Sequence, residues 1–468
     1  MMDIKIKILV FGTGRYYQSY KEKLDKYDIV AFLDNDITKQ NIYLDSKKIY
    51  PPSQIEFLKF DFIYLMGKDW QNMKLQLLAI GIKEDIIRNY LDLEKEYIPW
   101  EMPAVWRTDH SSKYFDFALI SFSLGLTGAP MALLNLARVL KANGYSPIIV
   151  SNEDGALKNE CLKADIPVSI DEKINTDICE IERWVLYTSN ALINTIMYCP
   201  LLEKYSLKIP ILLWVHEAKQ YYEEIRNKIK IWKLPSTIVP LAVGNIAARN
   251  YEHYFKVKPY ILLYGLEKYA IEKRKDSKYI VTIIGSICER KGQALLLKAY
   301  INLPIELQQN IKIWVIGEGN INFLKGLSDE DKDQIRETPN IIFWGQVMQK
   351  EMKRFYSQTD LLVCPSLEDP MPITVTEALM NEIPVIVSDK CGTSVFINNY
   401  SSGVIVKSGN IEDLSEKLEW CYYHQEELEI CAKNNQIIFE KYFSLRSLQE
   451  NLKKIIKGVG MKAKGWTV

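Results

Sequence analysis

Short β-rich runs alternate with helical stretches along most of this chain, and this alternation restricts it to α/β folds built from βαβ units. The alternation forms three series. The first covers residues 1–95 and predicts a small Rossmann-like domain, and a Pro-containing polar stretch at 96–113 reads as a linker. The other two cover 114–271 and 272–468 and predict two consecutive doubly wound, Rossmann-like domains.

The strongest runs predict individual strands and helices. Strands are expected at 6–11, 29–33, 62–66, 117–122, 147–150, 185–187, 211–215, 279–284, 311–316, 341–344, 361–363 and 385–387, with helices at 73–80 and 131–143. Ligands of such sheets bind outside the carboxyl ends of the strands. The predicted strand exits are 123–128, 188–190 and 216–217 in the second series, and 285–286, 317–319, 345–346, 365–369 and 388–389 in the third. If the two domains face each other, these exits line one cleft.

Composition excludes several classes of protein. Lys+Arg and Asp+Glu number 59 each, so no overall basic field recruits nucleic acid, and an anionic ligand must be held by local groups. The eight cysteines form no CxxC pair, which favours reduced thiols and a cytoplasmic location. The four histidines show no i, i+4 spacing, so we expect no metal centre. We also expect neither a signal peptide nor a membrane-spanning helix, while attachment to a membrane surface stays open.

The segment 365–388, PSLEDPMPITVTEALMNEIPVIVS, points most directly at a substrate. It predicts a strand exit, a Pro-rich turn, a helix and a second strand. Glu377 is expected in the first turn of the helix, where backbone N–H groups already favour anions. We interpret Glu377 as an acceptor for ribose hydroxyls and Asp369 as an acceptor for sugar hydroxyls. The alternative is that Glu377 only stabilises its helix.

A glycine turn with two cations follows the first strand of the third series. The segment Gly285-Ser-Ile-Cys-Glu-Arg290-Lys291-Gly292 combines close backbone approach with a guanidinium and an ammonium. A diphosphate requires that combination. The alternative is a solvated basic pair at an ordinary turn.

These motifs together resemble glycosyltransferase family 4, the retaining enzymes of the GT-B fold. The likeness covers about residues 117–457, and the stretches GSICERKGQ, WVIGEGN, IIFWGQV and EALMNEIPVIVSD match in order. The resemblance implies two facing Rossmann-like domains, a nucleotide-diphosphate sugar as donor, and no metal or other cofactor. It also implies that the last helix returns to the domain at 114–271.

The resemblance assigns roles residue by residue. The implied catalytic residues are Asp369, His216, Arg290 and Lys291. The implied donor-binding residues are Glu377, Gly128, Gly285, Ser286, Glu368, Pro370, Met371, Pro372 and Ile373. His216 matches the family histidine beside the donor sugar, and Gly128 matches the glycine turn that faces the donor phosphates and the acceptor.

Two positions depart from the family pattern. The first acid is Asp369 where the family has Glu, with Glu368 beside it, and the eight-residue step to Glu377 favours Asp369. Ser286 stands where many members carry Arg, so Arg290 and Lys291 must supply most of the positive charge.

The amino-terminal turn Gly12-Thr-Gly14, followed by Asp34, matches half of a dinucleotide fingerprint. Tyr17 occupies the third glycine position, where it hinders close strand–helix packing. The turn resembles the small Rossmann-like domains found beside sugar-modifying enzymes. A scaffold or partner-docking role is favoured over NAD or nucleotide binding.

The leading hypothesis is a cytoplasmic retaining glycosyltransferase that acts on a glycan or lipid-linked acceptor in bacterial surface polysaccharide or glycoconjugate assembly. A mixed basic and apolar helix predicted at 220–234 could place it on the inner face of the membrane, or it could be a packed surface helix. One alternative is an NAD-dependent sugar-nucleotide oxidoreductase or epimerase that uses Gly12 and Asp34. Another is a non-catalytic subunit that binds nucleotide sugars.

Overall fold

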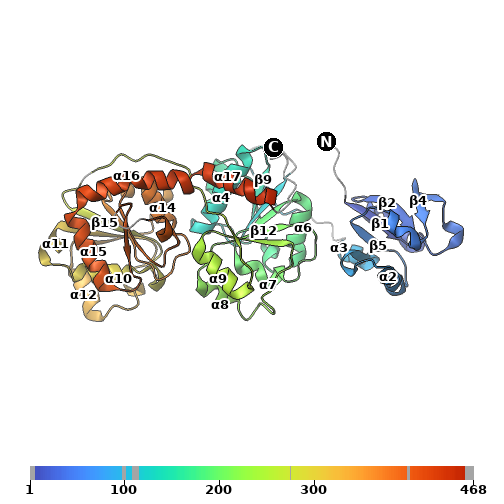
Figure 1. Cartoon of the computed structure of the whole chain (residues 1–468), viewed down its shortest axis with the longest axis horizontal. Helices are drawn as coiled ribbons and strands as arrows, with labels where there is room; N and C mark the ends of the chain where they lie inside the picture. Colours follow the sequence, from blue (N-terminus) through green and yellow to red (C-terminus); the bar gives the residue numbers. More distant parts are fainter. Residues whose placement is uncertain (1–5, 97–101, 108–114, 275, 398–400, 459–468) are drawn as a thin grey trace. The chain divides into compact units, whose positions relative to one another are not determined.

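The computed structural model describes residues 6–96, 102–107, 115–274, 276–397 and 401–458 (Figure 1). The chain divides into two compact units, Met1–Met102 and Pro103–Val468. Among the described residues three predominantly parallel sheets form, one in the first unit and two in the second. The polar cluster at 108–112 and the stretch 97–101, both assigned to a linker, lie outside the described residues.

The first unit is a Rossmann-like layer structure whose strand order is β3-β4-β2-β1-β5-β6. Its strands are β1 Lys7–Phe11, β2 Asp28–Leu33, β3 Tyr43–Leu44, β4 Lys47–Tyr50, β5 Phe62–Leu65 and β6 Ile87–Asn89, and its α-helices are α1 Arg15–Tyr20, α2 Trp70–Ala79 and α3 Tyr90–Glu96. Only the β3–β4 pair is antiparallel within this described sheet. Apolar residues of both sheet faces form two buried clusters.

The second unit begins with a sheet of strand order β14-β13-β12-β11-β8-β9-β10-β7. Its strands are β7 Val105–Trp106, β8 Phe117–Ser121, β9 Pro147–Ser151, β10 Val168–Ile170, β11 Ala191–Ile193, β12 Ile211–Val215, β13 Ile238–Ala242 and β14 Tyr260–Ile261. Its helices are α4 Gly128–Ala142, α5 Leu157–Lys163, α6 Ile178–Thr188, α7 Cys199–Leu202, α8 Lys219–Ile225 and α9 Asn245–Phe255. We refer to this layer structure as the acceptor-side domain, after the role that the family resemblance implies for it. Its edge strand β7 comes from the stretch 96–113 and pairs antiparallel with β10, so part of that stretch is not a linker.

The strand predicted at 185–187 is wrong, because these residues lie in α6. Asp177 caps this helix by accepting a hydrogen bond from the Cys179 N–H, and Ile181, Trp184 and Val185 bury one face at helical spacing. The strand is β11, and residues 188–190 precede it. They therefore lie at the amino edge of the sheet, away from the ligand-binding edge.

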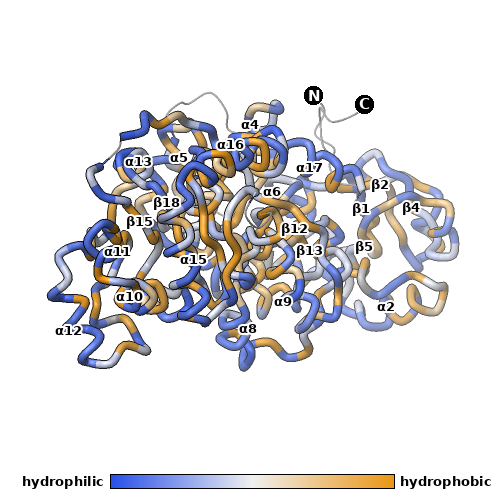
Figure 2. The backbone as a smooth tube through the Cα atoms, turned by 60° about the vertical axis from the view of Figure 1, so that its left-hand side comes forward, coloured by the Kyte–Doolittle hydropathy of each residue, from blue (hydrophilic) through white to orange (hydrophobic). Residues whose placement is uncertain are grey.

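The last sheet has the strand order β17-β16-β15-β18-β19-β20, which is the doubly wound order with its reversal between β15 and β18. Its strands are β15 Tyr279–Ile284, β16 Ile311–Ile316, β17 Ile341–Gly345, β18 Leu361–Cys364, β19 Val385–Ser388 and β20 Val404–Val406. Its helices are α10 Gln293–Ile301, α11 Ile305–Asn310, α12 Asp329–Glu337, α13 Gln349–Gln358, α14 Ile373–Met380, α15 Ile411–Tyr423, α16 Gln425–Tyr442 and α17 Leu445–Gly458. We refer to this last sheet and its helices as the donor-side domain, again after the role that the family resemblance implies. Figure 2 colours central strands such as β12 and β15 as hydrophobic, as expected of parallel strands covered on both faces.

The carboxyl-terminal helices join the two domains of the second unit. α16 lies along the donor-side domain, and α17 continues over α4 of the acceptor-side domain (Figure 1). The Gln449 side-chain amide donates to Asn143 Oδ1 at 2.7 Å. At the junction, a Cβ on Gly265 would lie 2.9 Å from the Leu448 Cβ, so the crossing requires a residue without a side chain.

Candidate functional site

The loop 365–372 leaves β18 at the reversal of strand order, where doubly wound sheets bind their ligands. Asp369 is held through its backbone, because its N–H donates to the Lys390 carbonyl at 3.0 Å and its carbonyl accepts from the Gly392 N–H at 2.8 Å. A Cβ on Gly392 would lie 1.7 Å from the Pro370 carbonyl oxygen. This close approach fixes the path of the loop.

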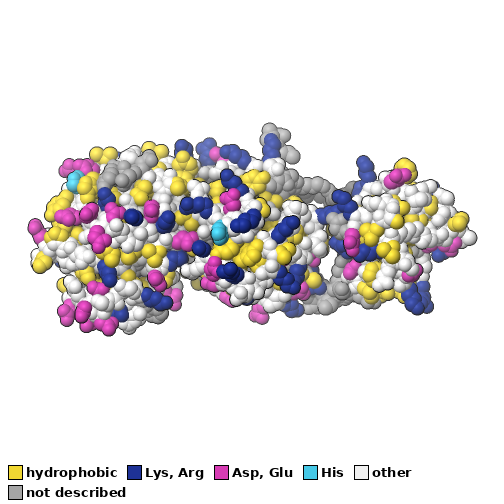
Figure 3. Space-filling model, turned by 60° about the horizontal axis from the view of Figure 1, so that its bottom comes forward, with side chains coloured by type: hydrophobic (Ala, Val, Ile, Leu, Met, Phe, Trp, Pro, Cys, Tyr) yellow, Lys and Arg dark blue, Asp and Glu magenta, His cyan; other side chains and the backbone are white. Residues whose placement is uncertain are grey.

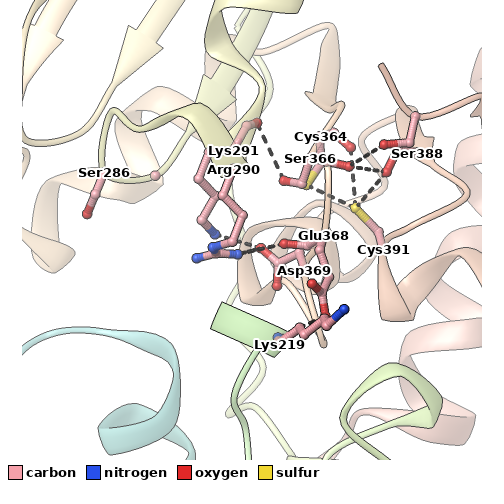
Figure 4. Close-up of polar contacts among 12 residues, drawn as sticks. Lys219, Ser286, Arg290, Lys291, Cys364, Ser366, Glu368, Asp369, Ser388 and Cys391 are labelled. Carbon is pink, nitrogen blue, oxygen red and sulfur yellow. Dashed lines mark hydrogen bonds and ion pairs between the residues drawn. The ribbon is translucent and has the colours of Figure 1, made fainter. Parts of the chain in front are cut away.

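A buried polar cluster supports the same loop (Figure 4). Ser388 Oγ donates to the Ser366 carbonyl at 2.5 Å, and both serines are fully buried. The sulfur atoms of Cys364 and Cys391 lie 3.6 Å apart. No disulfide joins the eight cysteines, all of which belong to the described part of the chain, as the scattered spacing predicted.

The two predicted cations meet the predicted first acid. Lys291 Nζ lies 2.6 Å from Asp369 Oδ2, and Arg290 Nη1 lies 3.7 Å from the same oxygen (Figure 4). Arg290 Nη1 also donates to the Glu368 carbonyl at 2.8 Å. Burial is the largest single influence and lowers the pKa of Lys291, but the attraction to Asp369 and Cys364, together with the hydrogen bond to Asp369, raises the pKa overall above its usual value. Lys291 is therefore cationic throughout the physiological range.

The turn that presents these cations is built on glycines. Gly292 has φ of 75°, and a Cβ there would lie 2.5 Å from the Pro365 carbonyl oxygen. Gln293 Nε2 donates to the carbonyls of Gly285 and Ser286 at 3.2 and 3.1 Å, which fixes the preceding turn. Ser286 itself is exposed and lies apart from Arg290 and Lys291 in Figure 4.

Glu377 does not lie in the first turn of its helix. α14 begins at Ile373, directly after Pro372, so Glu377 is in the second turn, beyond the reach of the helix-terminus argument. Its side chain is set by a tertiary contact instead, because the Tyr356 hydroxyl donates to Glu377 Oε2 at 2.5 Å. Burial raises the pKa of Tyr356 far above its usual value, and the neighbouring carboxylate adds to the shift, so Tyr356 stays a neutral donor.

The acceptor-side domain presents His216 directly after β12. Its ring packs against Trp214 with centroids 4.5 Å apart, and Nε2 is buried without a hydrogen-bond partner among the described residues. Burial lowers the pKa of His216 to about 3, so the ring is neutral. The backbone N–H of His216 donates to Glu217 Oε2 at 2.8 Å, and the backbone N–H of Ile196 donates to Glu217 Oε1 at 3.1 Å.

The start of α4 faces the start of α14 across the two domains. A Cβ on Gly128 would lie 3.7 Å from Ile373 Cδ1. No side chain in the described residues caps either helix, so first-turn N–H groups of both remain for other acceptors. Met371 lies beside them, and a Cβ on Gly244 would come within 2.3 Å of its Cε atom.

Glu368 and Asp369 point to different partners. Asp369 meets the cations of its own domain, whereas Glu368 Oε1 accepts from the Lys219 N–H at 3.1 Å and from Asn250 Nδ2 at 2.6 Å. Both partners of Glu368 belong to the acceptor-side domain. Of the two adjacent acids, the structure therefore brings Asp369 together with Arg290 and Lys291.

Several residues at this site were not predicted to act there. Tyr356 reaches it from α13 and Asn250 from α9, and the Tyr264 hydroxyl lies 2.7 Å from Thr376 Oγ1. Glu217 was recognised as part of a strand exit but was given no role. Burial raises the pKa of Glu217, and hydrogen bonds from the Thr195 hydroxyl and from three backbone N–H groups oppose this rise. In the local sequence, the only feature that indicated a role for Glu217 was a carboxylate placed after a fully apolar strand.

A pocket lies at the opposite edge of the donor-side sheet. This pocket of about 650 Å³ is lined by Tyr279, Asp360 and Pro384, which start or precede β15, β18 and β19. It is therefore separate from the strand exits that carry Asp369, Arg290 and Lys291.

The predicted nucleotide turn of the first unit is occupied by its own side chains. The N–H of Thr13 donates to Asp34 Oδ2 at 3.0 Å, its hydroxyl donates to the same oxygen, and the Asp36 N–H donates to Oδ1 at 2.9 Å. Burial alone raises the pKa of Asp34, but these hydrogen bonds lower it overall. Both oxygens of the carboxylate that a dinucleotide ribose requires thus already accept hydrogen bonds inside the turn.

Two Rossmann-like domains with opposed ligand-binding edges define the class of GT-B proteins, and solved structures agree. HepE of Anabaena in complex with UDP-glucose matches with a TM-score of 0.60 at 14% identity, over 74% of this chain and 100% of that chain. WaaG, a glycosyltransferase involved in lipopolysaccharide biosynthesis, matches with a TM-score of 0.54 at 15% identity, over 73% and 100%.

Family models divide the chain in the same way. The model for glycosyl-transferase family 4 matches residues 112–246, and that for glycosyl transferases group 1 matches 267–437. The second unit therefore belongs to the family 4-like glycosyltransferases, as the motifs predicted. Residues 4–88 match the model C2185-like, N-terminal.

Similar sequences support the same family over shorter segments. Alpha-galactosylglucosyldiacylglycerol synthase of Streptococcus pneumoniae is 34% identical over 118 residues, which are 24% of this chain and 29% of that protein. The lipopolysaccharide glucosyltransferase WaaG of Escherichia coli is 24% identical over 185 residues, 39% of this chain and 48% of that protein. The chain thus spans less than half of the length of either relative.

Proposed function

We propose that this chain transfers a sugar from a nucleotide-diphosphate sugar to a hydroxyl group, with retention of configuration. Family membership and the GT-B fold support this activity. The acceptor class is a glycan or lipid-linked glycan of bacterial surface polysaccharide or glycoconjugate assembly. This choice of acceptor class is motivated by two similar proteins whose names refer to a glycolipid and to lipopolysaccharide.

The observation that carries the proposal is the cluster of Arg290, Lys291 and Asp369 beside the helix start at Ile373. The transition state of sugar transfer resembles an oxocarbenium ion that departs from a diphosphate. Two fixed cations and backbone N–H groups stabilise the leaving oxygens without reorganisation. Arg290 and Lys291 supply this positive charge in the proposed reaction, which uses no metal ion.

In the proposed mechanism the bond between the anomeric carbon and the phosphate oxygen breaks, while the acceptor oxygen bonds to the same face of the sugar. The leaving phosphate takes the acceptor proton, so no carboxylate nucleophile is required. Asp369 accepts a sugar hydroxyl. The buried Nε2 of neutral His216 satisfies its open hydrogen bond with the same sugar.

The stereochemistry of the product tests the retaining step. The purified full chain is incubated with an α-linked donor and an acceptor glycan, and the anomeric coupling constant of the product is measured by NMR. The proposal predicts an α-linked product, and a β-linked product contradicts it. A donor that binds but releases no nucleotide would instead support the non-catalytic binding subunit.

The oxidoreductase alternative is not favoured by these findings. It requires Asp34 to accept ribose hydroxyls, yet both oxygens of Asp34 already accept hydrogen bonds inside the turn. The family models that match the second unit are those of glycosyltransferases, and neither supports an NAD-dependent reaction.

Glu377 is proposed to bind the ribose hydroxyls of the donor, with Tyr356 holding its carboxylate. Replacing Glu377 with Gln should weaken nucleotide diphosphate binding by about tenfold, because a charged acceptor for ribose hydroxyls is lost. Tyr356→Phe should weaken binding less, by a few-fold, since it removes only the positioning hydrogen bond. Titration calorimetry with the nucleotide diphosphate measures both. Wild-type affinity in folded Glu377→Gln would remove this role.

We also propose that the acceptor-side domain contacts a membrane surface. The helix predicted at 220–234 is wrong in extent, because α8 ends at Ile225, and Tyr222, Ile225 and Ile229 are buried. Exposed residues of this region include Ile231, which is 68% exposed, and the cations Arg226, Lys228, Lys230, Lys233, Lys256 and Lys258. Figure 3 shows dark-blue cations around a hydrophobic area in the middle of the chain, where α8 and α9 lie in Figure 1. No helix in the described residues is long and apolar enough to cross a bilayer. We place the enzyme in the cytoplasm, at the inner membrane face.

Flotation with vesicles tests this contact. The chain should float with vesicles that contain 30% anionic lipid at low salt and much less with neutral vesicles, because each cation near the surface contributes about 1 kcal/mol. A triple variant, Lys228→Ala with Lys230→Ala and Lys233→Ala, should float several-fold less. Equal flotation of this variant and the wild type would show that this surface does not bind the membrane.

A further inference from the structure

Glu368 connects the two domains of the second unit. Its backbone belongs to the donor-side loop, and its side chain accepts hydrogen bonds from the Lys219 N–H and the Asn250 side chain of the acceptor-side domain. Figure 4 shows Lys219 below this carboxylate, on the side away from Arg290 and Lys291. The sequence separations of 149 and 118 residues exclude a local capping contact.

The two ends of this connection lie next to the residues proposed to hold the sugar. Glu368 precedes Asp369, and Lys219 follows His216 by three residues, at the start of α8. Asn250 lies on α9, which follows the next strand. The carboxylate therefore joins the loop that carries Asp369 to the strand exit that carries His216.

We infer that Glu368 is a positioning residue that holds the two domains together and sets the spacing between Asp369 and His216. This inference rests on the proposed function. It gives Glu368 a different role from donor binding. The neighbouring contacts of the same loop, Met371 with Gly244 and Ile373 with Gly128, are apolar. Glu368 supplies a directional, charged contact between the same two domains.

The inference predicts a particular kinetic pattern. Glu368→Ala should lower kcat for transfer by about 10- to 100-fold, because misplacing a reactant by about 1 Å can cost 10²-fold. Nucleotide diphosphate affinity should stay within about twofold, since Arg290, Lys291 and Glu377 all belong to the donor-side domain. Asn250→Ala should act in the same direction but more weakly.

The double variant separates a shared contact from two independent defects. If Glu368 and Asn250 act through one hydrogen bond, the double variant should be no worse than Glu368→Ala alone. Additive losses would show that the two side chains act separately and would overturn the inference. Asn250→Ala also keeps the test possible if Glu368→Ala fails to fold.

Hydrogen exchange tests the connection without any activity. The Lys219 amide is itself a donor to Glu368, so its exchange should be about tenfold faster in Glu368→Ala, because the protecting hydrogen bond is lost. Glu416→Ala, at an exposed position of α15, is the matched control and should leave that amide unchanged. Unchanged Lys219 exchange in folded Glu368→Ala would overturn the inference. If Lys219 exchanges faster in Glu368→Ala than in the wild type, but the wild-type protein turns over no nucleotide sugar, the proposed function is contradicted and the domain connection stands.

Discussion

Replacing Lys291 with alanine is expected to lower the rate of sugar transfer by about 10²- to 10³-fold, the usual cost of removing one preorganised group from a developing negative charge. Lys291 lies 2.6 Å from Asp369 and is held at the edge of the sheet by the turn that Gly292 permits. Its raised pKa keeps the ammonium charged, so the loss should not depend on pH between about 6 and 8. Initial rates of nucleotide release measure the effect.

A lysine outside the cleft provides the matched control for this prediction. Lys298 lies on α10 and pairs with Asp331 at 3.2 Å, so Lys298→Ala removes the same charge elsewhere in the same domain. The rate of sugar transfer by Lys298→Ala should stay within about twofold of the wild-type rate. Comparable losses in the two variants would mean that net charge, rather than the position of Lys291, explains the defect.

Asp369→Asn is expected to lower kcat by about 10²-fold while nucleotide diphosphate affinity holds or rises. Affinity should hold because the variant removes a carboxylate that competes with phosphate for Lys291 and Arg290. The side chain of Asp369 is only 8% exposed, and its amide replacement keeps the size and one acceptor oxygen. Parallel measurements of kcat and of the dissociation constant separate these effects.

Glu368→Gln decides which of the adjacent acids contacts the sugar. It should lower kcat less than Asp369→Asn does, because it weakens the connection to Lys219 and Asn250 and leaves the cationic cluster intact. Asp333→Asn, on the surface of α12, is a control that should keep wild-type kinetics. A larger loss in Glu368→Gln than in Asp369→Asn would assign the sugar contact to Glu368.

Long apolar strands allowed most of the fold to be predicted. The strands at 211–215, 279–284 and 311–316 have the predicted limits, because continuous apolar runs bounded by polar residues leave little choice of structure. Short elements were missed, among them β11 and β20, whose three residues carry too little periodicity. The run at 185–187 was misassigned because its helical spacing appears only when residues 178–188 are read together.

The candidate site was predictable where one segment contains both the residue and its reason. Arg290 and Lys291 were predicted in the glycine turn after the strand at 279–284, and Asp369 was predicted at a strand exit; the structure brings the three together. The contacts that join residues of different elements could not be predicted from any local sequence pattern. The hydroxyl that holds Glu377 belongs to α13, and the partners of Glu368 belong to another domain. α14 begins at Ile373, which places Glu377 in its second turn. The residue pattern alone did not show where this helix begins.

The central claim is that the Arg290–Lys291–Asp369 cluster turns over a nucleotide-diphosphate sugar. It is tested most directly by incubating the purified full chain and its Lys291→Ala variant with a panel of UDP-, GDP- and ADP-linked sugars and measuring released nucleotide. The account predicts that the wild type releases nucleotide diphosphate from at least one donor, at a rate about 10²-fold or more above that of Lys291→Ala. No release from any donor, or equal release by the two proteins, would contradict it.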